Sequence, residues 1–314
     1  MNRGRAAGEE STQPPIFAIV GPTGVGKTDL ALRLAQRLEA EIVNADSRQV
    51  FRGLDIGSAK PTPEERVLVP HHLYDVVDPD QSFDCARYRE LAGAVIADVR
   101  GRGRPVVLVG GTGLYVKVLR HGICPGPPRD TAIRSRLSAS EAARPGTLHE
   151  LLRATDPSAA ERLHPHDSIR LIRALEVHEL TGKPLSAWQA EHGFRATELA
   201  LRVVGLTMDR AALYERINRR CEAMVARGLV EEVRRLWERG FGPDLGPLRS
   251  IGYREVGCYL QGRCDLARAV ADMAQASRRL AKRQLTWFRA DPSIRWYDVS
   301  AREVGAVCDD LSLA

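Results

Sequence analysis

The feature that most constrains the fold of this chain is the segment GPTGVGKT at residues 21–28. It fits the pattern G-x-x-x-x-G-K-[ST] at every position. The apolar run IFAIV (16–20) precedes it, and the leucine- and alanine-rich segment DLALRLAQRLEA (29–40) follows it. Such a run followed by helical periodicity predicts a buried strand and then a helix. The loop between them is therefore predicted to bind phosphate through its backbone N–H groups and the helix N-terminus.

The residue types within this loop predict distinct roles. The lysine of such a loop neutralises phosphate oxygens, and the final hydroxyl holds Mg²⁺. We therefore expect Lys27 to contact a diphosphate or triphosphate and Thr28 to be the metal ligand, with Mg²⁺ as the cofactor. The other diphosphate-binding candidates are the remaining loop residues, Gly21, Pro22, Thr23, Gly24, Val25 and Gly26. The motif does not identify the molecule that carries the phosphates.

The rest of the chain predicts an α/β fold with a helical interruption. Further strands are expected at 41–46, 72–78, 105–111, 201–208 and 294–299, with helices at 83–103, 209–239 and 247–290. Alternating strands and helices favour a parallel sheet with helices on both faces. Only helical periodicity is found from Pro125 to about His192. We expect a P-loop NTPase-like domain (15–124 and 200–314), an all-helical insertion (125–199) and a disordered tail (1–14).

Composition excludes several classes of protein. No apolar run approaches the roughly 18 residues of a transmembrane helix, and no apolar core follows the first arginines as in a secretory signal. The six cysteines form no Cys-x-x-Cys pair, which disfavours a zinc site or a disulfide framework and favours a reducing, cytoplasmic setting. The 46 basic and 40 acidic residues give a net charge of +6, which alone does not identify a polyanionic partner.

Two polar positions follow predicted strands and are candidates for the chemistry. Ligands of open parallel sheets bind beyond the carboxyl ends of the strands. Asp46 ends the second strand, where it can be a metal-holding acid, a general base, or a cap or turn residue. The segment LVGGTGLY (108–115) offers the Thr112 hydroxyl but no acid, and no Asn-Lys-x-Asp motif is present. A motor ATPase and a switch GTPase are therefore disfavoured.

Two arginine-rich segments suggest a polyanionic partner. The segment 275–290 is basic with no acid, and on a helix Arg278, Lys282 and Arg289 share a face. In the segment 164–186, Asp167 is placed to cap a helix that carries Arg170 and Arg173. Each segment has an alternative interpretation as an ordinary solvated helix face.

Seven segments together resemble the tRNA dimethylallyltransferase family. They run in the family's order from Ile16 to about Arg289: GPTGVGKT, NADSRQVFRGLDIGSAKP, HHLYDVVDP, VGGTGLY, HPHDSIRLIRALEV, RSIGYREV and RRLAKRQLTWFR. Phe51, Ser58 and His166 depart from the Tyr, Thr and Asn that are usual in the family. The zinc-finger extension of eukaryotic relatives is not found, so the chain looks bacterial.

The resemblance implies an activity and roles for the candidates. The loop would hold the diphosphate of dimethylallyl diphosphate, and the enzyme would transfer the dimethylallyl group to the N6 amine of adenosine 37, beside the anticodon of tRNA. Asp46 would take the proton from that amine, and Thr112 would lie in the reaction channel. Arg220 would join Thr23, Lys27 and Thr28 as a diphosphate contact. The diphosphate would leave with Mg²⁺ and basic residues absorbing its charge.

The resemblance also implies a tRNA-binding surface, with the helical insertion holding the anticodon stem-loop. The matching residues are Asp46, Ser47, Arg48, Gln49, Arg134, Ile169, Arg170, Leu171, Ile172, Arg173, Arg249, Ser250, Ile251, Gly252, Tyr253 and Arg254. The expected partners are tRNA and dimethylallyl diphosphate, with no membrane, and the expected state is a monomer. Two alternatives are a P-loop small-molecule kinase of the nucleoside type, with ATP in the loop, and a non-enzymatic RNA-binding protein. ATP binding without RNA would favour the kinase.

Overall fold

The computed structural model describes residues 14–194 and 196–313, so the predicted tail lies outside the described residues except for Pro14. The chain divides into two compact units. The α/β unit comprises the chain up to Arg120 and from Leu199 onward, and the helical unit comprises His121–Glu198. Among the described residues, no helix is both long and apolar enough to span a membrane.

The α/β unit contains one six-stranded sheet in the order β3-β2-β4-β1-β5-β6, and every paired strand is parallel. The strands are β1 (Ile16–Val20), β2 (Glu41–Asn44), β3 (His71–His72), β4 (Val106–Val109), β5 (Arg202–Thr207) and β6 (Arg295–Asp298). The parallel α/β prediction is therefore confirmed. The predicted strand at 72–78 is wrong in extent, because Leu73 and Asp75 have φ of 63° and 56°, a left-handed backbone that ends an extended strand.

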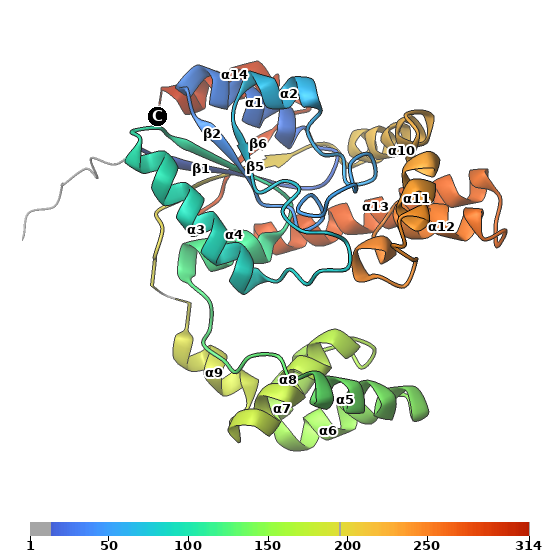
Figure 1. Ribbon diagram of the computed structural model, residues 1–314. Coiled ribbons are helices and arrows are strands. Elements are labelled where there is room, and N and C mark those ends of the chain that lie inside the picture. Colours follow the sequence, from blue (N-terminus) through green and yellow to red (C-terminus); the bar gives the residue numbers. More distant parts are fainter. Residues whose placement is uncertain (1–13, 195, 314) are drawn as a thin grey trace, which may run out of the picture. The chain divides into compact units, whose positions relative to one another are not determined.

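Helices cover both faces of this sheet, with α1 and α14 on one face and α3 and α4 on the other (Figure 1). The helices of the α/β unit are α1 (Lys27–Leu38), α2 (Pro63–Leu68), α3 (Cys85–Gly101), α4 (Gly113–His121), α10 (Arg210–Ala226), α11 (Leu229–Glu238), α12 (Tyr253–Leu260), α13 (Leu266–Arg289) and α14 (Val304–Ser312). The sequence did not predict α2 or α14. Both are short, so they offer little hydrophobic periodicity.

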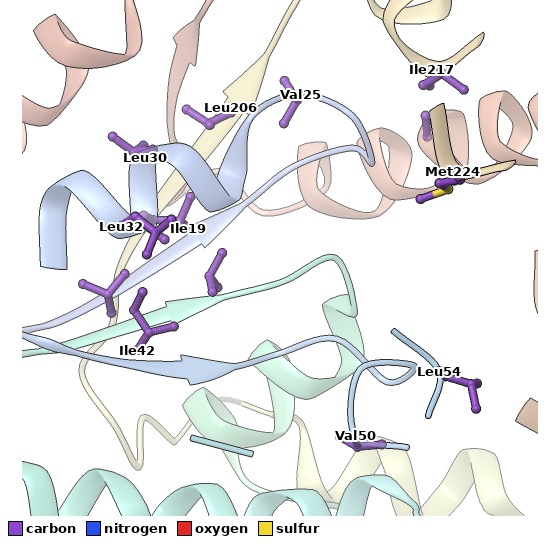
Figure 2. Close-up of a cluster of buried hydrophobic side chains, with 14 of the residues drawn as sticks. Ile19, Val25, Leu30, Leu32, Ile42, Val50, Leu54, Leu206, Ile217 and Met224 are labelled. Carbon is purple, nitrogen blue, oxygen red and sulfur yellow. The ribbon is translucent and has the colours of Figure 1, made fainter. Parts of the chain in front are cut away.

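The core of the α/β unit forms where α1 meets the sheet. Leu30 and Leu34, one turn apart on α1, are fully buried, as are Ile19 of β1 and Leu206 of β5. Figure 2 shows this cluster continuing past Val25 of the loop toward the side chains of α10. The Val25 side chain thus anchors the glycine-rich loop in the core of the unit.

The helical unit has a separate small core. Its helices are α5 (Thr131–Ala143), α6 (Thr147–Thr155), α7 (Pro157–Arg162), α8 (Ser168–Thr181) and α9 (Leu185–His192). Leu148 and Leu152 of α6 are buried against Leu171 and Leu175 of α8. Asp167 begins α8 by accepting a hydrogen bond from the Arg170 amide, as its position in the sequence predicts.

The sheet order decides where the site forms. The strands β2, β4 and β1 are neighbours, and all run in the same direction. The loop 21–26, the segment 45–49 and the segment 110–112 therefore leave the sheet at the same edge.

Candidate active site

The loop at 21–26 turns tightly before α1 begins. Gly24 and Gly26 have φ of 84° and 107°, which favour glycine, and Gly26 immediately precedes the first residue of α1. The Lys27 ammonium folds back over the loop and donates hydrogen bonds to the carbonyls of Gly21 at 3.1 Å and Pro22 at 2.8 Å. The predicted phosphate-loop lysine therefore closes its own loop.

A cavity of about 360 Å³ brings predicted residues together beside this loop. Thr23 of the loop, Asp46 after β2 and Arg220 of α10 all line it. Four further arginines line it as well: Arg48, Arg249, Arg254 and Arg283. Its apolar lining includes Ile217, Met224, Met273 and Leu280. A cavity with convergent charges and an apolar wall suits a ligand that has an anionic end and a hydrocarbon end.

Asp46 is fixed by the residue two positions before it. The buried Asn44 accepts a hydrogen bond from the Asp46 amide at 2.8 Å and donates one to the Asp46 carbonyl at 3.0 Å. The Asp46 carboxylate accepts the Arg48 amide at 2.8 Å. No helix begins between 47 and 50, so the helix-cap interpretation of Asp46 is wrong. The contact with Arg48 is that of a side chain that caps a turn.

Thr112 lies against the Asp46 segment. Its hydroxyl accepts a hydrogen bond from the Ser47 amide at 3.0 Å, and its own amide donates to the Ala45 carbonyl at 3.2 Å. Gly110 is required here, since a Cβ at this position would lie 2.1 Å from the Ala45 carbonyl oxygen. The structure therefore brings Asp46 and Thr112, predicted from two different strand ends, into adjacent positions.

The electrostatics of the site centre on two cations and one acid. Burial, with the nearby charge of Arg220, lowers the pKa of Lys27 to about 8, and Asp46 opposes this shift. Burial also lowers the pKa of Arg220, and Asp46 again partly offsets the effect. Two desolvated cations beside one carboxylate leave an excess of positive charge. This environment favours an anionic ligand.

Comparison with known proteins identifies the family. A family model described as IPP transferase matches residues 49–291. The chain belongs to the IPP transferase family. A second model, described as isopentenyl transferase, matches residues 14–74, which include the glycine-rich loop. The resemblance found in the sequence motifs is confirmed.

Relatives in this family match over nearly the whole length of the chain. A tRNA dimethylallyltransferase of Syntrophobacter fumaroxidans is 50% identical over 91% of this chain and 84% of the relative. One of Geobacter sulfurreducens is 49% identical over 93% of this chain and 94% of the relative.

Solved structures of the family share the fold. The tRNA isopentenylpyrophosphate transferase of Bacillus halodurans is 42% identical, with a TM-score of 0.70 over 95% of this chain and 94% of that structure. A eukaryotic dimethylallyltransferase described as acting on tRNA is 28% identical, with a TM-score of 0.75 over 91% of this chain and 74% of that structure.

Two residues of this IPP transferase site were not among the sequence candidates. Gln284 of α13 accepts the Thr23 amide at 2.8 Å and donates to the Gly111 carbonyl at 3.0 Å. The sequence offered no local signal for Gln284, because only the packed structure shows that Ser277 and Leu280 of the same helix line the cavity. Glu232 of α11 gave no such signal either, since its partners lie far away in the sequence.

Glu232 holds two walls of the cavity. It is buried and accepts the Ile56 and Gly57 amides at 2.7 and 3.2 Å, and the Tyr253 hydroxyl at 2.6 Å. A Cβ at Gly57 would lie 2.5 Å from the Tyr253 ring. The segment that contains Gly57 therefore packs directly against Tyr253, which belongs to the segment 249–254 that was predicted to contact tRNA.

The predicted tRNA contacts of the α/β unit fall into two groups. One group lines the cavity: Asp46, Arg48, Arg249, Ser250, Ile251, Tyr253 and Arg254. The other is involved in local structure. The side-chain amide of Gln49 donates to the backbone carbonyls of Ser58 and Ala59. The backbone amide of Ser47 donates to the Thr112 hydroxyl. Gly252 immediately precedes α12 and has a φ of 92°.

In the helical unit, several predicted tRNA contacts are also structural. The guanidinium groups of Arg134 and Arg173 bind the fully buried Glu176 at 2.7 and 2.6 Å. The hydrogen bonds that Glu176 accepts from them outweigh its burial and hold its pKa at about 2. Leu171 and Ile172 pack in the core of the unit. The exposed part of this predicted segment is Ile169, which is 80% exposed, and Arg170, which pairs with Asp167.

The basic segment 275–290 forms the second half of α13. Arg278, which was predicted to share a basic face with Lys282 and Arg289, donates a hydrogen bond to Asn218 of α10. Arg279, Lys282, Arg283 and Trp287 line an open groove, and Trp287 is 50% exposed. Cationic and aromatic side chains on one exposed surface suit the backbone and bases of RNA.

The predicted metal ligand, Thr28, lies in the first turn of α1, just after the glycine-rich loop. Thr28 lines a separate cavity together with Asp55, Lys60 and Asp75. Both of these carboxylates pair with the buried Lys60, at 2.7 and 2.5 Å. Among the described residues, no group of three or more His, Cys, Asp or Glu side chains is arranged to hold a metal.

Proposed function

We propose that this member of the family transfers the dimethylallyl group of dimethylallyl diphosphate to the N6 amine of adenosine 37 in tRNA. The observation that carries the proposal is the cavity that Thr23, Asp46 and Arg220 share, in a chain half identical to tRNA dimethylallyltransferases. The cavity combines an electropositive, phosphate-binding side with an apolar wall. No comparison favours the kinase alternative.

The diphosphate binds to the glycine-rich loop. Lys27 and Arg220 supply positive charge, and the loop residues Gly21, Pro22, Thr23, Gly24, Val25 and Gly26 supply the backbone around it. As the carbon–oxygen bond breaks, negative charge develops on the diphosphate. Cations already fixed in a buried site stabilise that charge without reorganising.

Asp46 is the general base. The N6 nitrogen attacks C1 of the dimethylallyl group, the bond from C1 to the diphosphate oxygen breaks, and the N6 proton passes to the Asp46 carboxylate. Asn44 binds the backbone of Asp46, and the Arg48 amide donates to its carboxylate. Thr112 orients the same segment through the Ser47 amide. Positioning of this kind lowers the barrier because the reacting groups need no further alignment.

Mg²⁺ is proposed as the cofactor, with Thr28 as its protein ligand. The ion would neutralise charge on the leaving diphosphate. The chain's own contribution at this point is the hydroxyl in the first turn of α1, at the positive end of the helix dipole.

The tRNA is proposed to contact both units. In the α/β unit the contacts are the cavity arginines. In the helical unit, which we propose holds the anticodon stem-loop, the direct contacts of the segment 169–173 are the exposed Ile169 and Arg170. Arg134 and Arg173 support this surface through their ion pairs with Glu176. The target adenine must leave its base stack to reach the half-buried Asp46 in the cavity. The protein is proposed to act as a monomer in the cytoplasm, where its tRNA substrate is made.

Incubation with unmodified tRNA and isotope-labelled dimethylallyl diphosphate tests the proposal. We expect label in N6-dimethylallyl adenosine after digestion to nucleosides. After digestion to oligonucleotides with a base-specific ribonuclease, we expect label in the fragment that contains position 37 and in no other fragment. Excess ATP is expected to compete poorly. Phosphoryl transfer from ATP without isoprenyl transfer would contradict the proposal and support a kinase.

A further inference from the structure

Gln284 connects the two loops that carry the proposed chemistry. Its side-chain oxygen accepts the Thr23 amide of the glycine-rich loop at 2.8 Å, and its side-chain nitrogen donates to the Gly111 carbonyl at 3.0 Å. One amide group thus uses both of its functions to bridge β1 and β4 from a third element, α13. A Cβ at Gly111 would lie 2.1 Å from the Gln284 nitrogen, so the approach is close.

The bridge continues to the proposed base. Gly111 precedes Thr112, whose hydroxyl accepts the Ser47 amide at 3.0 Å. Ser47 follows Asp46. An unbroken chain of hydrogen bonds and peptide bonds therefore joins the diphosphate loop, through Gln284 and Thr112, to the carboxylate that takes the proton.

We propose that Gln284 is a positioning residue that sets the distance between the bound diphosphate and Asp46. It acts through Thr23 on one side and through Gly111 and Thr112 on the other, and it does not touch the reacting atoms. This inference rests on the proposed function. Because a misplacement of about 1 Å can cost a factor of about 10² in rate, a side chain that fixes two loops has a large effect on turnover.

The chemistry of the bridge makes it specific for an amide. The side chain must accept from an N–H and donate to a carbonyl at the same time, and only an amide or a protonated carboxyl of this length does both. Methionine has a similar length but leaves the Thr23 amide and the Gly111 carbonyl without their partner. An ionised glutamate accepts from Thr23 but repels the Gly111 carbonyl.

The first test compares Gln284→Met with wild type in steady-state prenyl transfer. We expect kcat to fall about 10- to 100-fold, with KM for dimethylallyl diphosphate changed less than about 3-fold and an unchanged melting temperature. Gln275→Ala is the matched control, because Gln275 is an exposed glutamine on the same helix. A wild-type kcat in Gln284→Met would overturn the proposal. A lower KM with an unchanged kcat would also overturn it, because that result would show that Gln284 competes with the diphosphate for the Thr23 amide.

The second test uses pH and separates positioning from general structural damage. Protonated glutamate reproduces the hydrogen-bond pattern of glutamine, so the kcat of Gln284→Glu relative to wild type is expected to rise as the pH falls from 8 to 5.5. The corresponding ratio for Gln284→Met is expected to stay flat. A flat ratio for Gln284→Glu would contradict the bridge. If wild type itself transfers no isoprenyl group, the proposed function fails, which is a different result from any of these.

Discussion

The Ser47 amide donates a hydrogen bond to the Thr112 hydroxyl at 3.0 Å, joining the segment after β2 to the segment after β4. The two residues are 65 positions apart in the sequence, and adjacent parallel strands place them side by side. The contact holds the residue next to Asp46 through two groups that are neither acid nor base.

Replacement of Thr112 with valine is expected to lower kcat about 10-fold while tRNA affinity stays within a factor of about two. Valine keeps the shape of threonine but leaves the Ser47 amide without its acceptor, which costs roughly 1–3 kcal/mol when the group is buried. Single-turnover measurements with saturating substrates check this. Thr112→Ser retains the hydroxyl and should stay near wild type. Equal losses in both variants would instead implicate the threonine methyl group.

Asp46→Asn is expected to reduce the rate of the chemical step by about 10²–10⁴. Asparagine keeps an oxygen that can accept the Arg48 amide, so the local turn survives, but the amide cannot take a proton from adenine N6. Rapid-quench single-turnover rates, together with equilibrium tRNA binding, separate the two functions. Normal chemistry in Asp46→Asn would reduce this residue to a turn-forming role.

Lys27→Ala is expected to lower kcat/KM for dimethylallyl diphosphate by about 30- to 1000-fold, because one cation fixed against a developing anion contributes on the order of 2–4 kcal/mol. Initial rates at limiting diphosphate substrate provide the measurement. Lys183→Ala, in the helical unit, is the control and should leave kcat/KM unchanged. A Lys27→Ala enzyme with normal kcat/KM would remove the lysine from the mechanism.

The pH dependence of diphosphate use follows from the lowered pKa of Lys27. This pKa is about 8 in the unliganded protein, so the side chain is positive below pH 8 and loses its charge as the pH rises through that value. The kcat/KM for dimethylallyl diphosphate is therefore expected to decline above about pH 8. Lys27→Arg keeps its charge in this range and should lack that decline. The same decline in Lys27→Arg would assign it to another group.

The buried Glu176 is expected to stabilise the helical unit in a pH-dependent way. Its folded-state pKa of about 2 lies below the ordinary value of 4.5, so its contribution is complete above pH 4.5 and is lost as the pH falls toward 2. Glu176→Ala should cost about 3–5 kcal/mol at pH 7, since it leaves Arg134 and Arg173 without their partner. Hydrogen exchange of α8 reports the loss, with Glu179→Ala as the partly exposed control. Equal protection at pH 7 would show that the cluster adds no stability.

The salt dependence of tRNA binding should separate RNA-facing arginines from structural ones. Arg283 lines both the cavity and the exposed groove of α13, so Arg283→Ala is expected to reduce the slope of log Kd against log salt by about one. Filter binding between 50 and 300 mM salt gives the slope. Arg33→Ala is the control, because this surface arginine pairs with Asp29 on α1. An unchanged slope in Arg283→Ala would place the RNA elsewhere.

The sequence by itself determined the glycine-rich loop, the parallel α/β class and the identity of Lys27, Asp46 and Thr112 as candidates. These features are local, since a strand, a turn that needs glycine and a helix are specified by neighbouring residues. The resemblance of the ordered motifs then specified the family. The helical segment that interrupts the alternation of strands and helices could also be predicted, because a change in hydrophobic periodicity is read from neighbouring residues without knowledge of packing.

Only the tertiary structure decided which residues act together. Gln284 and Glu232 bind loops that lie between 173 and 261 positions away in the sequence. No local sequence pattern distinguishes such a bridging side chain from a solvated one. In the sequence, nothing distinguishes Arg134 and Arg173 from Arg170. In the structure, Arg134 and Arg173 bind the buried Glu176, whereas Arg170 lies on the surface and pairs with Asp167. Burial and partnership are properties of the packed chain, because they depend on what the fold brings against each side chain.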